Sequence, residues 1–395
     1  MKSEQKFLIS CAALLAAGTA FAQEQTNVAA PAPAPEKSGG TKIVLELPEL
    51  PSADKIKVKV SGLVQAQYVY ANASGAKASD QNGFSIRRSS IGVSADVGDA
   101  WSAKIVYEFD STANGGSNYN DYIDTAIISR KFDAGTLTVG HKKTHFMHEE
   151  YSPSSKFLCL ERSINSNFVS GNKYAKGLAG YHIGVFWDGR LDEAIDYGVS
   201  LTNAVDKDYN ERSNDLALTG NVGYTMKLDG DAKLYFGLNG TVNFGNDGDK
   251  ISATNTTKPT TNKGTVYGIE PYVQFTDGGL TLLADAYYID GESAADLHSF
   301  YGLNFTAAYR LECGLEPAVR FTYLNTDSGK VNANIQNRVP ASGNHDNATT
   351  YYAGANYYFN KYVKLAAGFE YGHYFGQGAH ADDSFSFRTM LQVSF

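Results

Sequence analysis

After a short N-terminal region, the chain is dominated by runs in which apolar and polar residues alternate. In one such run Trp101, Ile105 and Phe109 fall on one face of an extended segment, and Lys104 and Glu108 fall on the other. Successive side chains of a β-strand point to opposite faces, so period-two alternation predicts strands with one apolar and one polar face.

The alternating runs predict an even number of strands, which is typical of bacterial outer-membrane barrels. About sixteen strands are expected, at approximately 55–70, 84–97, 101–110, 121–132, 135–143, 176–187, 195–204, 215–228, 232–245, 263–275, 279–290, 298–311, 313–326, 349–359, 361–375 and 384–395.

The connections between these runs are alternately short and long. Gly98-Asp99 and Asp277-Gly278 are tight links, whereas 71–83, 246–262 and 328–349 are long and polar. A membrane barrel with short periplasmic turns and long external loops predicts this order, and a soluble β-sandwich does not. Charges in the middle of strands also favour a barrel, because its inner face lines water.

The stretch from Gly140 to Phe168 is too long and too polar for a hairpin turn. It nevertheless keeps Phe146, Met147 and Leu160, which predicts that it packs against other residues. Counting connections makes it the third external loop. The predicted fold class is therefore all-β: a transmembrane antiparallel β-barrel of about sixteen strands whose third external loop folds inward and narrows the channel.

Three regions are expected along the chain. Residues 1–22 place Lys2 and Lys6 around the start of an apolar run and end in a small-x-small site, which is typical of a secretory signal peptide. Residues 23–54 contain an Ala-Pro repeat and predict an extended periplasmic tether. Residues 55–395 form the predicted barrel domain of an exported protein.

Composition narrows the set of partners. The formal net charge is -8, which argues against nucleic acid. Tyr and Phe are abundant, at 26 and 21 residues, and suit aromatic girdles at the two membrane surfaces, where the barrel contacts outer-membrane lipid. Cys159 and Cys313 either form a disulfide or stay free.

Several segments together resemble the phosphate-selective porin O and P family of outer-membrane channels. They are Phe84 to Arg88, Leu137 to Phe146, Leu160 to Ser163, Gly354 to Asn360 and Arg388 to Phe395. The resemblance spans nearly all of the predicted barrel. It implies an outer-membrane location, sixteen strands, a homotrimer, loops folded into the pore and basic side chains that attract small anions such as phosphate.

The last strand carries a second resemblance. It alternates and ends in Phe395, with Arg388 and Gln392 on the polar face. Such an ending is similar to the recognition signal of the barrel assembly machinery, which is therefore an expected partner.

The candidate residues for a pore constriction that binds anions are basic residues in or near the third loop and on the polar faces of strands. They are Arg88, Lys104, Lys142, Lys143, Lys156, Arg162, Arg310 and Arg320. Confinement in a low-dielectric section amplifies each charge. For each of them, solvation or pairing with Glu149, Glu150 or Glu161 is the alternative.

The expected function is passive, water-filled diffusion of small hydrophilic solutes and ions, with anions or phosphate preferred. A non-selective or cation-preferring general porin is the alternative, and a barrel enzyme or an adhesin is a more remote one. The sequence contains no nucleophile elbow, phosphate loop or zinc signature in the required context, so no catalytic residue and no cofactor are expected. His141, His145 and His148 lack a second ligand cluster, and no metal is expected.

Overall fold

The computed structural model describes ten stretches of the chain. They are residues 56–73, 81–110, 120–171, 178–203, 216–244, 265–291, 299–326, 331–332, 344–376 and 382–395. The predicted signal segment 1–22 and the predicted tether 23–54 lie outside the described residues.

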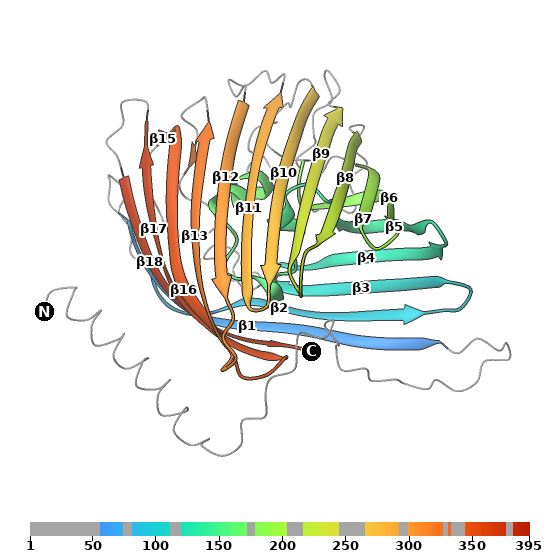
Figure 1. Ribbon diagram of the computed structural model, residues 1–395, viewed down its shortest axis with the longest axis horizontal. Helices are drawn as coiled ribbons and strands as arrows, with labels where there is room; N and C mark the ends of the chain where they lie inside the picture. Colours follow the sequence, from blue (N-terminus) through green and yellow to red (C-terminus); the bar gives the residue numbers. More distant parts are fainter. Residues whose placement is uncertain are drawn as a thin grey trace, which may run out of the picture. The chain divides into compact units, whose positions relative to one another are not determined.

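Within the described residues, sixteen antiparallel strands form one closed barrel, which confirms the predicted fold class (Figure 1). The strands are β1 (Lys57–Ala73), β2 (Gln81–Asp96), β3 (Trp101–Asp110), β4 (Asn120–Phe132), β5 (Gly135–Lys143), β6 (Tyr181–Leu191), β7 (Ile195–Asn203), β8 (Leu216–Lys227), β9 (Lys233–Phe244), β10 (Thr265–Asp277), β11 (Leu280–Gly291), β12 (Ser299–Tyr309), β13 (Leu315–Thr326), β16 (Asn347–Tyr358), β17 (Val363–Phe375) and β18 (Asp382–Ser394).

A separate two-stranded sheet consists of β14 (Val331–Asn332) and β15 (Asn344–His345). It falls in the long connection that the sequence predicts between residues 328 and 349. Strands of two residues are too short to produce a readable alternation, so this sheet is not predicted.

The barrel closes between its first and last strands. β1 pairs with β18 from Leu63↔Ser394 to Ala73↔Ser384. Beyond this ladder, the Gly62 N–H donates to the Phe395 carbonyl over 2.8 Å, and the Phe395 N–H donates to the Gly62 carbonyl over 3.0 Å. Closure leaves no unpaired strand edge, which a lipid environment requires.

The two faces of the barrel wall differ as the alternation predicts. The outward side chains of Ile105 and Val319 are 57% and 51% exposed, although both are large and apolar. Inward positions such as Asn239, Thr241 and Thr322 are polar and buried. An apolar outer face around a polar inner one suits a barrel surrounded by lipid. Among the described helices, none is long and apolar enough to cross a membrane.

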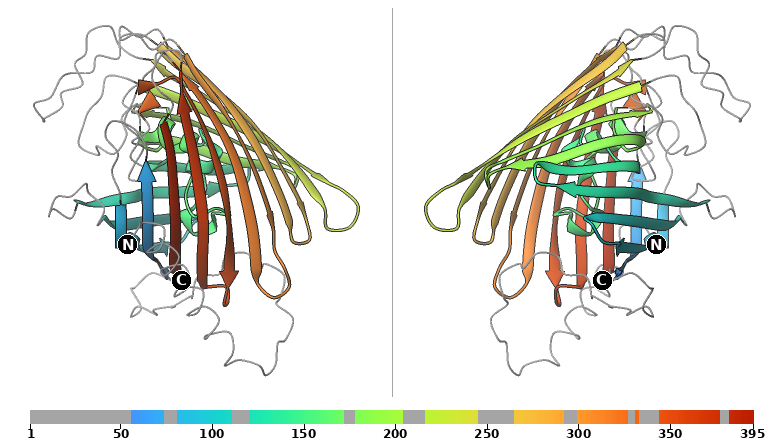
Figure 2. Two further views of the ribbon diagram at one scale, coloured as in Figure 1. Left: turned by 90° about the vertical axis from the view of Figure 1, so that its left-hand side faces the viewer. Right: turned by 90° about the vertical axis from the view of Figure 1, so that its right-hand side faces the viewer.

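The described parts of the segment between β5 and β6 lie inside the barrel, where their short helices are visible between the walls (Figure 2). They contain α2 (His148–Tyr151), the 3₁₀ helix η1 (Ser154–Lys156) and α3 (Ile164–Gly171). We call the described residues 144–171 and 178–180 the inner loop.

Two apolar clusters hold the inner loop against inward residues of the wall. In the first, Phe146 and Phe168 pack with Phe300, Leu324 and other inward residues of β11 to β17. The second joins Cys159 and Leu160 of the loop to Ala308, Ala318, Tyr352, Ala366 and Met390 of the wall. Each fully buried large apolar side chain contributes about 1.5–3 kcal/mol, so these clusters fix the loop to one side of the barrel.

Most strands lie within about three residues of their predicted bounds, and β6 departs furthest. β6 begins at Tyr181, whereas the sequence predicts a start near residue 176, and it continues to Leu191, beyond the predicted end at 187. Asp188-Gly189 has the composition of a turn, but here both residues pair with β7. As a result Asp188 and Arg190 join the barrel wall.

Candidate functional site

In the described part of the chain, three groups of ion pairs and hydrogen bonds, which we call fastenings, hold the inner loop in place. In the first, two arginines bind one carboxylate. Glu161 accepts hydrogen bonds from Arg87 Nε over 2.5 Å and from Arg88 Nη2 over 2.8 Å. The two arginines are adjacent in β2, yet both reach the same carboxylate because a β-bulge opposite Gln65 and Ala66 interrupts the register at this point. Arg88 also donates to Gln65 Oε1 over 2.8 Å.

The second fastening centres on Arg320 of β13. Its guanidinium donates to Glu149 of the loop over 3.0 Å and to Glu370 of β17 over 3.2 Å. It also donates to the carbonyls of Glu161 and Arg162, over 2.8 and 3.2 Å. One inward side chain of the wall therefore binds the loop at three places.

The third fastening lies within the loop and at its entrance. Glu150 pairs with Lys143 Nζ at 2.7 Å and with Arg162 Nε at 3.0 Å. Burial raises the pKa of Glu150, but Arg162 and Lys143 outweigh it and hold that pKa below its ordinary value. Glu150 is thus a carboxylate at neutral pH.

Backbone groups of the inner loop also bind the wall. Lys364 Nζ donates to the Phe157 carbonyl over 3.1 Å, and Asn356 Nδ2 donates to the Leu158 carbonyl over 2.8 Å. On the opposite flank, the His148 N–H donates to both oxygens of Glu270, over 2.8 and 2.9 Å. We call this set of buried contacts the packed face of the site.

A second set of side chains keeps contact with water, and we call it the open face. Lys142 Nζ and His145 Nε2 each lie 2.7 Å from the carboxylate of Asp188, whose side chain is 33% exposed. Tyr151, which is 41% exposed, lies tilted against His145 with ring centres 4.3 Å apart.

Tyrosines continue the open face along neighbouring strands. Tyr235 donates from its hydroxyl to Asp196 over 2.8 Å, and Tyr272 donates to the Tyr235 hydroxyl over 3.3 Å. Both rings lie close against the wall because the facing positions are Gly223 and Gly237, where a Cβ would collide with them.

Of the eight predicted site residues, five belong to one of these two faces. Arg88, Lys143, Arg162 and Arg320 are ion-paired in the packed face. Lys142 pairs with Asp188 in the open face.

The other three lie apart from the packed face. Lys104 is exposed on β3, and Lys156 is exposed in η1. Arg310 follows the end of β12, and its guanidinium lies 3.6 Å from the ring centre of Tyr358. Whether any of the eight contacts a permeating ion stays a prediction.

Other members of the site are not among the predicted residues. Strict alternation turns Arg87 outward, and only the bulge brings it inside. Asp188 is missed because β6 is longer than predicted. The tyrosines Tyr235 and Tyr272 alternate inward, a signal that the sequence does contain.

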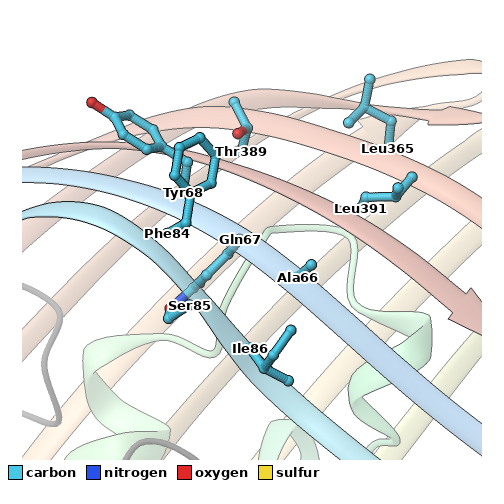
Figure 3. A pocket seen from close by; sticks show the side chains of 9 residues that line it. All are labelled: Ala66, Gln67, Tyr68, Phe84, Ser85, Ile86, Leu365, Thr389 and Leu391. Carbon is cyan, nitrogen blue, oxygen red and sulfur yellow. The ribbon is translucent and has the colours of Figure 1, made fainter.

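Outside the barrel, a groove of about 380 Å³ lies on the lipid-facing side of β1, β2, β17 and β18 (Figure 3). Tyr68 and Phe84 line it with ring centres 5.0 Å apart. Cys159, buried in the inner loop, and Cys313, exposed in a turn, are not joined by a disulfide. No group of three or more His, Cys, Asp or Glu residues in the described stretches is arranged to hold a metal ion.

Comparisons with known proteins agree on the architecture. A family model described as Gram-negative porin matches residues 10–377. No curated protein sequence matches the chain significantly. Among solved structures, the outer-membrane channel DcaP of Acinetobacter baumannii is 14% identical with a TM-score of 0.58, over 86% of this chain and 97% of that one.

Two further structures are similar. The anion-selective porin from Comamonas acidovorans is 11% identical with a TM-score of 0.61, over 86% of this chain and 100% of that one. OmpT of Vibrio cholerae in its trimer form is 15% identical with a TM-score of 0.54, over 86% and 99% of the two chains. At such identities, the likeness shows a shared fold.

Proposed function

This chain belongs to the family of Gram-negative porins, and we propose that it provides passive, water-filled diffusion of small hydrophilic solutes with a preference for anions. Family membership and fold make it a channel of the bacterial outer membrane and not an enzyme. A porin selects by the width of its pore and by the charges that line it. The choice of solute therefore depends on the site around the inner loop.

An excess of basic side chains around the inner loop carries the proposed anion preference. Among the described residues, the packed face contains six basic side chains and five carboxylates: Arg87, Arg88, Lys143, Arg162, Arg320 and Lys364, and Glu149, Glu150, Glu161, Glu270 and Glu370. A seventh basic side chain, Arg388, lies near Glu161 and Glu370. The whole chain, by contrast, has a net charge of -8. A confined positive excess favours anions, because screening is weaker inside a narrow section than at the surface.

Phosphate is the anion that the family resemblance of the sequence supports, and arginine is well suited to bind it. A homotrimer is part of the same proposal. Its support is the similarity to OmpT of Vibrio cholerae, which is described in a trimer form. Outer-membrane lipid and the barrel assembly machinery, engaged through the strand that ends in Phe395, complete the proposed partners.

Reversal potentials in planar bilayers test this proposal. With a tenfold gradient of potassium chloride, an anion-preferring pore gives a reversal potential with the sign of the chloride equilibrium potential. Phosphate added to one side is expected to reduce the chloride current. A potential of the opposite sign, or one near zero, would contradict the anion preference and favour a cation-preferring or non-selective general porin. Absence of any conductance would contradict the diffusion function itself.

A further inference from the structure

We propose that the open face binds neutral, hydroxylated solutes of the sugar class as they pass. The binding surface is a strip of rings and carboxylates, the aromatic strip, formed by Tyr151, His145, Tyr235, Tyr272, Asp188 and Asp196. This inference rests on the proposed diffusion function, since a solute must enter the lumen to reach the strip.

The aromatic strip contains two pairs of rings, one in the inner loop and one on the wall. Tyr151 lies tilted against His145 with ring centres 4.3 Å apart, and Tyr235 lies 5.6 Å from Tyr272 between ring centres. His148 of the inner loop stacks on the far side of this series, 4.3 Å from Tyr272. Tyr151 is also close enough to Asp188 and Asp196 to feel the charge of both carboxylates, and Asp196 in turn accepts the hydrogen bond from Tyr235.

The part of the strip that lies on the wall comes from neighbouring strands between β6 and β10, which makes it rigid. Asp188, Asp196, Tyr235 and Tyr272 come from β6, β7, β9 and β10, and the intervening β8 contributes Gly223. Glycine at this position and at Gly237 lets the tyrosine rings lie close to the backbone. Aromatic faces held in this way supply a large contact area with little loss of conformational freedom.

Polar groups border the ring faces. The hydroxyl of Tyr235 and the carboxylates of Asp188 and Asp196 offer hydrogen-bond partners beside the rings. A sugar presents apolar C–H faces and a rim of hydroxyl groups, so it matches an aromatic surface with a polar border. A few polar groups beside aromatic side chains are the usual means of orienting a small ligand.

The charge balance of the strip favours a neutral solute. Asp188 already has Lys142 and His145 at 2.7 Å. Asp196 lies directly opposite Arg190 in the ladder between β6 and β7. Each carboxylate therefore has a cationic neighbour, and neither offers the unpaired negative charge that an organic cation would need to bind strongly.

Block of single-channel current by maltotriose tests the inference on the full-length protein in planar bilayers. The current is expected to fall with sugar concentration and to saturate, whereas polyethylene glycol of similar size reduces it only in proportion to its concentration. Open channels with a non-saturating response to maltotriose would overturn the sugar site and leave the diffusion function standing. Stronger block by tetraethylammonium than by maltotriose would also overturn it.

Single substitutions test where in the channel maltotriose binds when it blocks the current. Tyr151→Leu and Tyr272→Leu are each expected to raise the half-blocking concentration about tenfold, because each removes one stacking surface. Tyr288→Leu is the matched control, because Tyr288 is an exposed residue of β11 on the lipid side. The half-blocking concentration of maltotriose is expected to be unchanged in this variant. Asp196→Asn keeps the hydrogen-bonding shape and is expected to preserve the sugar block. Equal effects of Tyr272→Leu and Tyr288→Leu would place binding elsewhere.

Discussion

The packed face and the open face use the same residue types for opposite purposes. On the packed face, the side chain of Glu161 is 4% exposed and binds two arginines. On the open face, Asp188 also binds two basic groups, but its side chain is 33% exposed. The charges of the first set hold the inner loop in place, while those of the second set remain in contact with the solution in the channel.

This difference separates stability from selectivity. Removing one partner of a buried ion pair leaves an uncompensated charge and costs several kcal/mol, whereas an exposed pair contributes little. A basic residue near a pore is therefore not a selectivity residue by type alone. We expect substitutions on the packed face to release the loop in addition to changing the local charge, and substitutions of exposed residues to change what passes while the loop stays in place.

The largest effect on the stability of the packed loop is expected from Glu161→Gln, which leaves Arg87 and Arg88 without their shared carboxylate. The substitution should destabilise the packed loop by about 3–5 kcal/mol. Cys159 is buried in the same loop, so its labelling by a maleimide reports loop opening. In a Cys11→Ser, Cys313→Ser background, the labelling rate should rise at least about 100-fold.

The matched control for this substitution is Glu193→Gln. Glu193 forms a 2.6 Å pair with Lys227 in which both side chains are strongly exposed. Breaking that pair should leave the labelling of Cys159 unchanged. If Glu161→Gln and Glu193→Gln behaved alike, the buried pairs would not be what fastens the loop.

The barrel could be predicted from the sequence because alternation is a local signal. β5 spans Gly135–Lys143, the residues that the pattern predicts. The inner loop could be anticipated for a related reason: Phe146 and Met147 are too apolar for a solvated loop, and both are fully buried.

The fastenings could not be predicted, because they depend on distant pairs and on backbone irregularity. Arg320 and Glu149 are 171 positions apart, and nothing in either neighbourhood specifies the other. Arg87 turns inward only because a bulge changes the register of β2. Alternation identifies which face a residue occupies, but it does not tell whether the inner loop covers that residue.

Lowering the pH should have an intermediate effect on the stability of the packed loop. Burial lowers the pKa of His148 to about 4, although Glu149 acts in the opposite direction. In a released loop His148 regains its ordinary pKa of about 6.5. The packed loop is therefore fully stable above pH 6.5 and loses about 2–3 kcal/mol as pH falls from 6.5 towards 4. Cys159 labelling with a pyridyl disulfide reagent should accelerate about 30- to 100-fold over this range.

His148→Phe tests the cause of this pH dependence. Phenylalanine keeps a ring for stacking on Tyr272 but cannot be protonated. Its labelling rate should stay constant from pH 6.5 to about 4.5, the ordinary pKa of a glutamate side chain in a released loop; the pKa of Glu150 in the packed loop lies lower. The same acceleration in wild type and variant would assign the pH dependence to another group.

The smallest effect is expected on selectivity, from Lys104→Glu. Lys104 is exposed on an inward position of β3, so its charge acts on ions in the channel and is partly screened by water and salt. Reversing it should change the ratio of cation to anion permeability about twofold, which corresponds to about 0.5 kcal/mol. Reversal potentials measure this change, and Lys361→Glu, in the exposed turn before β17, serves as the control. The decisive comparison is with loop opening: Lys104→Glu should shift the reversal potential towards cations and leave the labelling of Cys159 unchanged. A faster labelling rate in this variant would show that an exposed charge outside the packed face also holds the loop, and the division between packed and exposed charges would then be wrong.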